Sequence, residues 1–165
     1  MRFLEGGILS SISSKLLSVI IVILQFSILL VISVSAYNFS KCFYPFFVGS
    51  DSFSVNFVVD NETGEGALMF GLNLTNGGLN DLKASLTGTL VSSEGLSIKS
   101  AFDEVVIPSN HRSLLLITLS FSKDELEFYD FKNNPPSLMI QLRLKTFFGL
   151  VETRFDLVLP SEVLI

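Results

Sequence analysis

The sequence has no tryptophan, one cysteine, one histidine and few charged residues, and these shortages exclude several classes of function. Cys42 alone cannot form an intrachain disulfide, so the fold must rest on its apolar core. His111 alone cannot supply a metal site built from several imidazoles or thiolates. Charged residues make up 16% of the chain, with a net charge of −5. Because nucleic-acid binding needs a basic surface, we expect no nucleic-acid partner.

Residue patterns that support catalysis are also missing. His111 lies beside Ser109 and Ser113, but serines are common in turns, so the pattern favours a solvated turn over a catalytic pair. Asp103 and Glu104 are adjacent but lack the spacing of an EF-hand loop, which favours a charged strand end or bulge over a calcium site. The sequence therefore predicts no catalytic residues, no cofactor and no metal ion, and we expect a protein that is not an enzyme.

The most prominent feature present is one uncharged apolar run near the N-terminus. Residues Leu16 to Tyr37 contain no charged side chain. As a helix, these 22 residues would extend roughly 33 Å at about 1.5 Å per residue. This length suffices for a hydrocarbon core of about 30 Å. The run predicts a transmembrane helix over 16–37, preceded by a short cytoplasmic N-terminus at 1–15.

A cleaved signal peptide is the alternative interpretation of this run. Val34 and Ala36 fit a small-residue cleavage site, but the run is longer than an ordinary signal core and 15 residues precede it, which favours an uncleaved anchor. Arg2 and Lys15 precede the run and one lysine closely follows it. The positive-inside rule therefore gives only a slight preference for a cytoplasmic N-terminus. Both interpretations place the remainder of the chain outside the cytoplasm.

Three Asn-x-Ser/Thr sequons follow the apolar run, at Asn38, Asn61 and Asn73. Such sequons can receive a glycan only outside the cytoplasm. We therefore interpret the three asparagines as candidate N-glycosylation sites, and their position agrees with a C-terminal domain on the outside.

An aromatic segment leaves the predicted membrane span. Six aromatic residues lie between Tyr37 and Gly49, which favours an interfacial belt plus the first buried residues of the domain over a partner-binding collar. We assign residues 38–52 to a membrane-proximal connector. Cys42 within it is an acylation or intermolecular-pairing candidate, although a buried or idle thiol is the favoured interpretation.

From residue 53 onward, apolar and polar residues alternate. Alternation with period two is typical of strands with one buried and one solvated face. Recurring turn signals then predict an antiparallel β-sandwich of seven or eight strands over residues 53–165. The positions predicted to point inward are Leu68, Phe70, Leu72, Leu74, Leu86, Ile117, Leu119, Ile140, Leu142 and Phe155. The positions predicted to point outward are Met69, Asn73, Lys83, Thr87, Arg143, Lys145 and Glu152.

One short helix is predicted before the last hairpin. Ser122 and Glu125 have the spacing of a capping box, and the helix should end near Lys132 because a proline follows. In the hairpin, an even-length loop keeps both apolar rows on one face. This register brings Lys145 opposite Glu152 as a favourable surface pair.

The stretch from 53 to 160 resembles the water-stress and hypersensitive-response (WHy) domain of the group-2 late embryogenesis abundant (LEA14-like) proteins. The resemblance is carried by FGLNLTNGGLNDLKASLTGTLVSSEG and FDEVVIPSNHRSLLLITLSFS. Asn76 stands at the family's Asn-Pro position, with Gly77 in place of the proline, and Asn110 replaces the usual glycine after Pro108. The resemblance implies a small immunoglobulin-like β-sandwich with a helix, no catalytic residues, and a protective or interaction role.

We therefore predict a membrane-anchored, non-catalytic interaction or structural protein, whose partners are the lipid bilayer and a protein or a second copy of the chain. One alternative is an accessory single-span subunit of a larger surface or membrane complex, such as the stator of an archaeal motility filament. Gln25 would then mark a helix–helix contact. A second alternative is binding of an apolar ligand or lipid between the sheets, since 16 phenylalanines are available to line a pocket.

Overall fold

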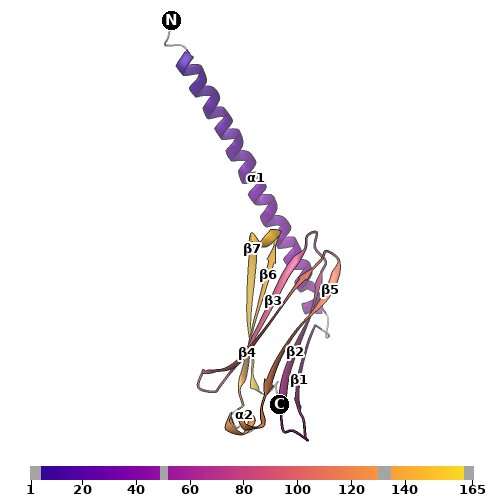
Figure 1. Cartoon of the computed structure of the whole chain (residues 1–165). Helices are drawn as coiled ribbons and strands as arrows, with labels where there is room; N and C mark the ends of the chain where they lie inside the picture. Colours follow the sequence, from indigo (N-terminus) through magenta and orange to yellow (C-terminus); the bar gives the residue numbers. More distant parts are fainter. Residues whose placement is uncertain (1–4, 49–51, 130–134, 162–165) are drawn as a thin grey trace.

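The structure, a computed structural model, describes residues 5–48, 52–129 and 135–161. One long helix leads into two antiparallel sheets (Figure 1). The described helices are α1 (Glu5–Val48), α2 (Lys123–Tyr129) and the single 3-10 turn η1 (Phe147–Gly149). The described strands are β1 (Phe53–Val59), β2 (Gly66–Asn76), β3 (Leu82–Val91), β4 (Ser97–Ile107), β5 (His111–Phe121), β6 (Ser137–Thr146) and β7 (Val151–Leu159). The predicted fold class is confirmed.

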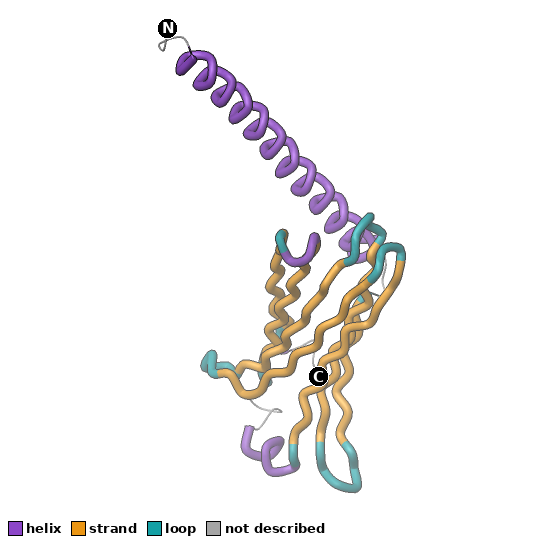
Figure 2. The backbone as a smooth tube through the Cα atoms, turned by 45° about the horizontal axis from the view of Figure 1, so that its top comes forward, coloured by secondary structure: helices purple, strands orange, loops and turns teal. Residues whose placement is uncertain are grey.

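The two sheets have the strand orders β1-β2-β5 and β4-β3-β6-β7. All neighbours pair antiparallel. Constant-type immunoglobulin domains place the fourth strand in the first sheet, whereas here β4 pairs with β3 in the second sheet. The β2–β3, β4–β5 and β6–β7 connections lie at the end of the sandwich where α1 arrives, and α2 lies at the opposite end (Figure 2).

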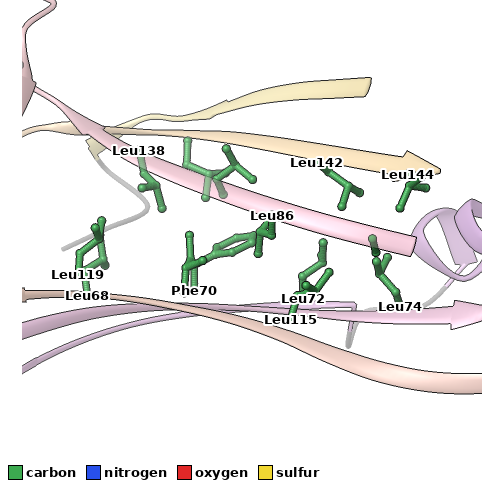
Figure 3. Packing of buried hydrophobic residues seen from close by; sticks show 14 of the residues in the cluster. Leu68, Phe70, Leu72, Leu74, Leu86, Leu115, Leu119, Leu138, Leu142 and Leu144 are labelled. Atoms are coloured by element: carbon green, nitrogen blue, oxygen red, sulfur yellow. The ribbon is translucent and has the colours of Figure 1, made fainter. Parts of the chain in front are cut away.

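The core consists of leucine-rich rows that face one another between the sheets (Figure 3). The alternation along β2, β3, β5 and β6 puts one row of each strand inside, with exposures from 0% to 6% for the predicted inward residues of these four strands. None of the seven positions predicted to point outward is buried. The face assignment is thus confirmed for four of the five strands on which inward residues were named.

The sandwich is closed along one edge and open along the other. At the β4/β5 edge, the Nζ of Lys99 donates a hydrogen bond to the Ser120 carbonyl oxygen at 2.6 Å, and Leu116 N donates to Asp103 Oδ2 at 2.8 Å. At the opposite edge, formed by β1 and β7, five inward-facing apolar side chains remain accessible to solvent. We call these residues the open edge: Phe53, Phe57, Val59, Phe155 and Leu157, each between 41% and 53% exposed.

Phe155 therefore corrects one prediction. Its register opposite the buried Leu142 puts it on the inward face of β7, yet it is 43% exposed. The reason is that β7 is an edge strand whose inner face the three-stranded sheet does not cover. The ring of Phe43 from α1 covers it in part, with 4.2 Å between ring centroids.

Helix α1 also extends further than predicted. The expected boundary at Tyr37 is not a helix end, because α1 continues to Val48 through the segment assigned to a connector. Side chains from its last turns pack into the sandwich, with Asn38 and Cys42 at most 1% exposed. These tertiary contacts stabilise turns that would otherwise fray.

The local predictions for α2 and the last hairpin are confirmed. Glu125 N donates to Ser122 Oγ at 3.2 Å, and Ser122 N donates to Glu125 Oε2 at 2.9 Å, which is the reciprocal capping box. The predicted helix end near Lys132 lies outside the described residues. Lys145 pairs with Glu152 across the hairpin, with 3.3 Å between Nζ and Oε2.

The open edge gives a direct test of the fold. Leu142→Ala should lower the free energy of unfolding by about 2–5 kcal/mol, because it removes a buried side chain and leaves a cavity. Leu157→Ala on the same face should cost less than about 1.5 kcal/mol, because that side chain already contacts water. Chemical unfolding of the full chain in detergent micelles measures both. Equal losses would contradict the open edge.

Candidate functional site at the helix–sandwich junction

The residues that the sequence analysis considered for catalysis or calcium binding, His111 and the pair Asp103 and Glu104, lie apart from one another and make local hydrogen bonds or ion pairs. His111 is exposed, and its Nδ1 lies 2.9 Å from the carbonyl oxygen of Ser109. Asp103 accepts backbone hydrogen bonds from Glu104 and Leu116, while Glu104 pairs with Lys83 at 2.7 Å. Within the described residues, no group of three His, Cys, Asp or Glu side chains could hold a metal ion.

The three sequon asparagines occupy different environments. Asn61 is exposed in the turn between β1 and β2, and Asn73 is exposed on β2. Asn38 is 0% exposed in the last third of α1, with both amide atoms hydrogen-bonded inside the protein. The structure therefore uses the Asn38 amide inside the protein, while Asn61 and Asn73 have side chains on the surface, and glycosylation of the three stays a prediction.

Asn38 instead joins α1 to the sandwich. Its Oδ1 accepts a hydrogen bond from Leu79 N at 2.8 Å, and its Nδ2 donates to Thr146 Oγ1 at 3.3 Å. Thr146 Oγ1 in turn donates to the Asp81 carbonyl oxygen at 3.5 Å. One side chain thus connects the helix to the β2–β3 loop and to the end of β6. We call this set of contacts the junction.

Gly78 in the β2–β3 loop makes the junction possible. A Cβ added at Gly78 would lie 2.3 Å from Asn38 Oδ1 and 2.9 Å from the Asn38 Cα, so only glycine allows the loop to approach the helix this closely. Asn76 holds the loop in shape: its Nδ2 donates to the carbonyl oxygens of Asn80 and Ile107 at 2.8 and 2.9 Å, and its Oδ1 accepts from Gly78 N at 3.0 Å.

The face of α1 that meets the sandwich follows helical spacing. Ser35, Asn38 and Cys42 are buried and recur every three to four residues, as expected for one helix face. The thiol of Cys42 lies within the hydrophobic core cluster, which confirms the interpretation of a buried cysteine. As folded, this thiol is not accessible for acylation or for a disulfide with another chain.

Sequence reasoning missed the junction because the Asn38 sequon suggested a solvent-exposed role. A usable signal was present in the two adjacent glycines at 77–78, which indicate a close backbone approach. Nothing local indicates which element approaches them, because Asn38 and Thr146 are 108 positions apart.

A second polar cluster lies at the opposite end of the sandwich. Lys99 Nζ donates to both carboxylate oxygens of Glu125, at 2.9 and 3.0 Å, and lies 5.1 Å from the Phe121 ring centroid. The hydrogen bond from the Ser122 backbone and then that from Lys99 hold the pKa of Glu125 below its ordinary value of 4.5. The cluster connects α2 to β4 and β5, so its role is structural.

No family model matches the sequence. No curated protein matches it either. Among solved structures, the chain is similar to part of a putative β-galactosidase from Bacteroides fragilis, with 15% identity over 64% of this chain and 16% of that chain at a TM-score of 0.42. It is also similar to part of Bacteroides uniformis β-glucuronidase 2, with 13% identity over 67% of this chain and 13% of that chain at a TM-score of 0.47.

A third similar structure is the putative ApaA protein from Bordetella pertussis, with 10% identity over 66% of this chain and 89% of that chain at a TM-score of 0.42. This chain spans less than a sixth of the β-glucuronidase and 16% of the β-galactosidase. Similarities at these identities and TM-scores assign no activity to it.

A pair of variants separates the structural role of Asn38 from a glycan-bearing role. Asn38→Ala and Ser40→Ala both destroy the sequon, but only Asn38→Ala removes the junction hydrogen bonds. Asn38→Ala should lower the free energy of unfolding by about 1–3 kcal/mol, because it leaves buried polar groups unpaired. Ser40→Ala, at an exposed position, should change it by about 0.5 kcal/mol or less. Thermal unfolding of the full chain in micelles, followed by circular dichroism, compares them. Equal behaviour would refute the junction.

The Glu125 cluster predicts a pH dependence. Because the pKa of Glu125 is lowered in the folded state, the carboxylate stabilises the fold above pH 4.5, and this stabilisation is lost as the pH falls through the folded-state pKa. The stability difference between wild type and Glu125→Gln should therefore shrink on acidification. Glu94→Gln in the exposed β3–β4 turn is the matched control. A difference that is constant with pH would contradict the assignment.

Proposed function

We propose that this protein is a membrane-anchored, non-catalytic interaction or structural protein that presents a LEA14-like β-sandwich outside the cytoplasm. The observation that carries the proposal is the junction, which connects a sandwich to a helix with an apolar, solvent-exposed surface. Among the described residues, one helix, over Leu16–Tyr44, is long and apolar enough to cross a membrane, and a signal sequence would pass the same test.

The continuity of α1 supports an anchor over a cleaved signal peptide. Cleavage after Ala36 would cut a helix whose buried face runs through Ser35 and Asn38. The charge-free stretch before that face, 16–34, has 19 residues and would extend about 28 Å as a helix. It fits a hydrocarbon core of about 30 Å without using any residue of the junction.

Several features support the LEA14-like, non-catalytic part of the proposal. The sandwich has a short helix before its last hairpin, as the family resemblance implies. The conspicuous polar residues, Asn38, Asn76 and the Lys99–Glu125 pair, are used in hydrogen bonds that shape the fold. Exposed Asn61 and Asn73 agree with an external location for the domain.

The open edge supports an interaction role. Its apolar residues lie on β1 and β7, one edge strand from each sheet, and exposed apolar groups at strand edges favour pairing with an extended segment of another chain. A protein partner therefore fits this edge better than a small ligand does, because the space between the sheets is filled by the core leucines (Figure 3).

The proposal is tested by membrane fractionation with protease protection. The full chain, tagged at either terminus and expressed in a native-like membrane, should stay with the membrane after alkaline extraction. An externally added protease should remove the C-terminal tag and spare the N-terminal tag. Release into the soluble fraction, or protection of the C-terminal tag, would overturn the proposal. A mature chain starting at Tyr37 would identify a cleaved signal peptide instead.

Two further measurements separate the alternatives. Purification in mild detergent after crosslinking should recover stoichiometric partners if the protein is an accessory subunit, such as a stator-like component. Mass spectrometry of the purified protein should find a bound lipid or apolar molecule if the sheets hold a ligand. Finding neither a stoichiometric partner nor a bound apolar molecule would argue against both alternatives and leave the membrane-anchored interaction protein as the proposal.

A further inference from the structure

The β6–β7 tip, residues 147–150, is an apolar turn beside α1 (Figure 1). Its sequence is Phe-Phe-Gly-Leu, and no charged residue lies between Lys145 and Glu152. Those two flanking charges pair with each other at 3.3 Å. Leu150 is 79% exposed. Through Leu150 the tip therefore presents an exposed apolar side chain at the end of the sandwich where the helix arrives.

The tip lies near the level where the apolar part of α1 ends. Thr146, the last residue of β6, contacts Asn38 at 3.3 Å, and the chain continues past Thr146 into the tip. On α1, burial continues beyond Asn38 to Ser35, which is 1% exposed, and to the half-buried Val34 and Val31. The sandwich therefore covers the helix up to the last turns of its charge-free stretch.

We propose that the β6–β7 tip inserts into the boundary between headgroups and acyl chains of the same bilayer that α1 spans. The proposal rests on the proposed function, because it requires α1 to be a membrane anchor. With residues 16–34 in a hydrocarbon core of about 30 Å, Ser35 lies at the boundary, and Asn38, one turn further along α1, holds Thr146 and the tip that follows it close to that depth. Tyr37 and Lys41, with 5.6 Å between Nζ and the ring centroid, lie nearby and are residue types that favour this zone.

The backbone of the tip suits a region of low water content. Leu150 N donates a hydrogen bond to the Phe147 carbonyl oxygen at 3.1 Å, so the turn satisfies part of its own polar backbone. Insertion would give the domain two membrane contacts, the helix and the tip. Two contacts fix the tilt of the sandwich relative to the bilayer, and with it the direction in which the open edge faces.

The absence of tryptophan from the chain allows a clean test. The full chain carrying Leu150→Trp is reconstituted in phosphatidylcholine liposomes, with or without bromine on the acyl carbons near the headgroup. Its fluorescence should shift to the blue, lose intensity in the brominated liposomes and resist quenching by aqueous acrylamide. Leu96→Trp, at a 65% exposed position in the β3–β4 turn at the opposite end of the sandwich, should show none of these effects.

Phe26→Trp, at a 70% exposed position near the middle of the apolar stretch, is measured in liposomes brominated toward the ends of the acyl chains and separates the two ways of failing. If bromolipids quench Phe26→Trp but not Leu150→Trp, the anchor stands and the tip insertion is overturned. If neither is quenched, the proposed anchor fails as well. A blue-shifted Leu150→Trp that bromolipids do not quench also overturns the proposal, because it would mean that protein and not lipid covers the tip.

Discussion

The amide of Asn38 is the interaction on which the arrangement of the whole chain depends. It bonds the β2–β3 loop through Leu79 and the end of β6 through Thr146, so the helix is fixed to both sheets at once. Buried amides are retained only when their hydrogen-bonding capacity is used, and no buried side-chain nitrogen or oxygen in the described residues lacks a partner. The last turns of α1 are therefore part of the domain, and the sandwich has a defined orientation relative to the apolar helix.

The two edges of the sandwich differ because different groups bridge the sheets. On the β4/β5 side, Lys99 and Asp103 bond across from one sheet to the backbone of the other. On the β1/β7 side, the ring of Phe43 from α1 packs against the ring of Phe155, with 4.2 Å between centroids. Apolar side chains further along β1 and β7 stay accessible, which leaves an exposed apolar surface on an otherwise well-packed small domain.

Several polar side chains of the described residues hold elements of the fold together. The asparagines at one end hold the loops against the helix, and the Lys99–Glu125 pair at the other end holds α2 against β4 and β5. Residues arranged in this way stabilise a scaffold, and function on such a scaffold depends on its surfaces. Two of its exposed apolar surfaces are the open edge and Leu150 at the β6–β7 tip.

The sequence by itself determined the features that depend on local backbone geometry. Period-two alternation identified the strands and the inward rows of β2, β3, β5 and β6, and the Ser122–Glu125 spacing identified the cap of α2, because strand pleating and the first helical turn act over a few residues. Only the tertiary structure decided the exposure of Phe155, the length of α1 and the burial of Asn38. Each depends on which distant element covers it. The inner face of edge strand β7 lacks an opposing sheet, and Asn38 is buried because Leu79, 41 residues further along the chain, packs against it.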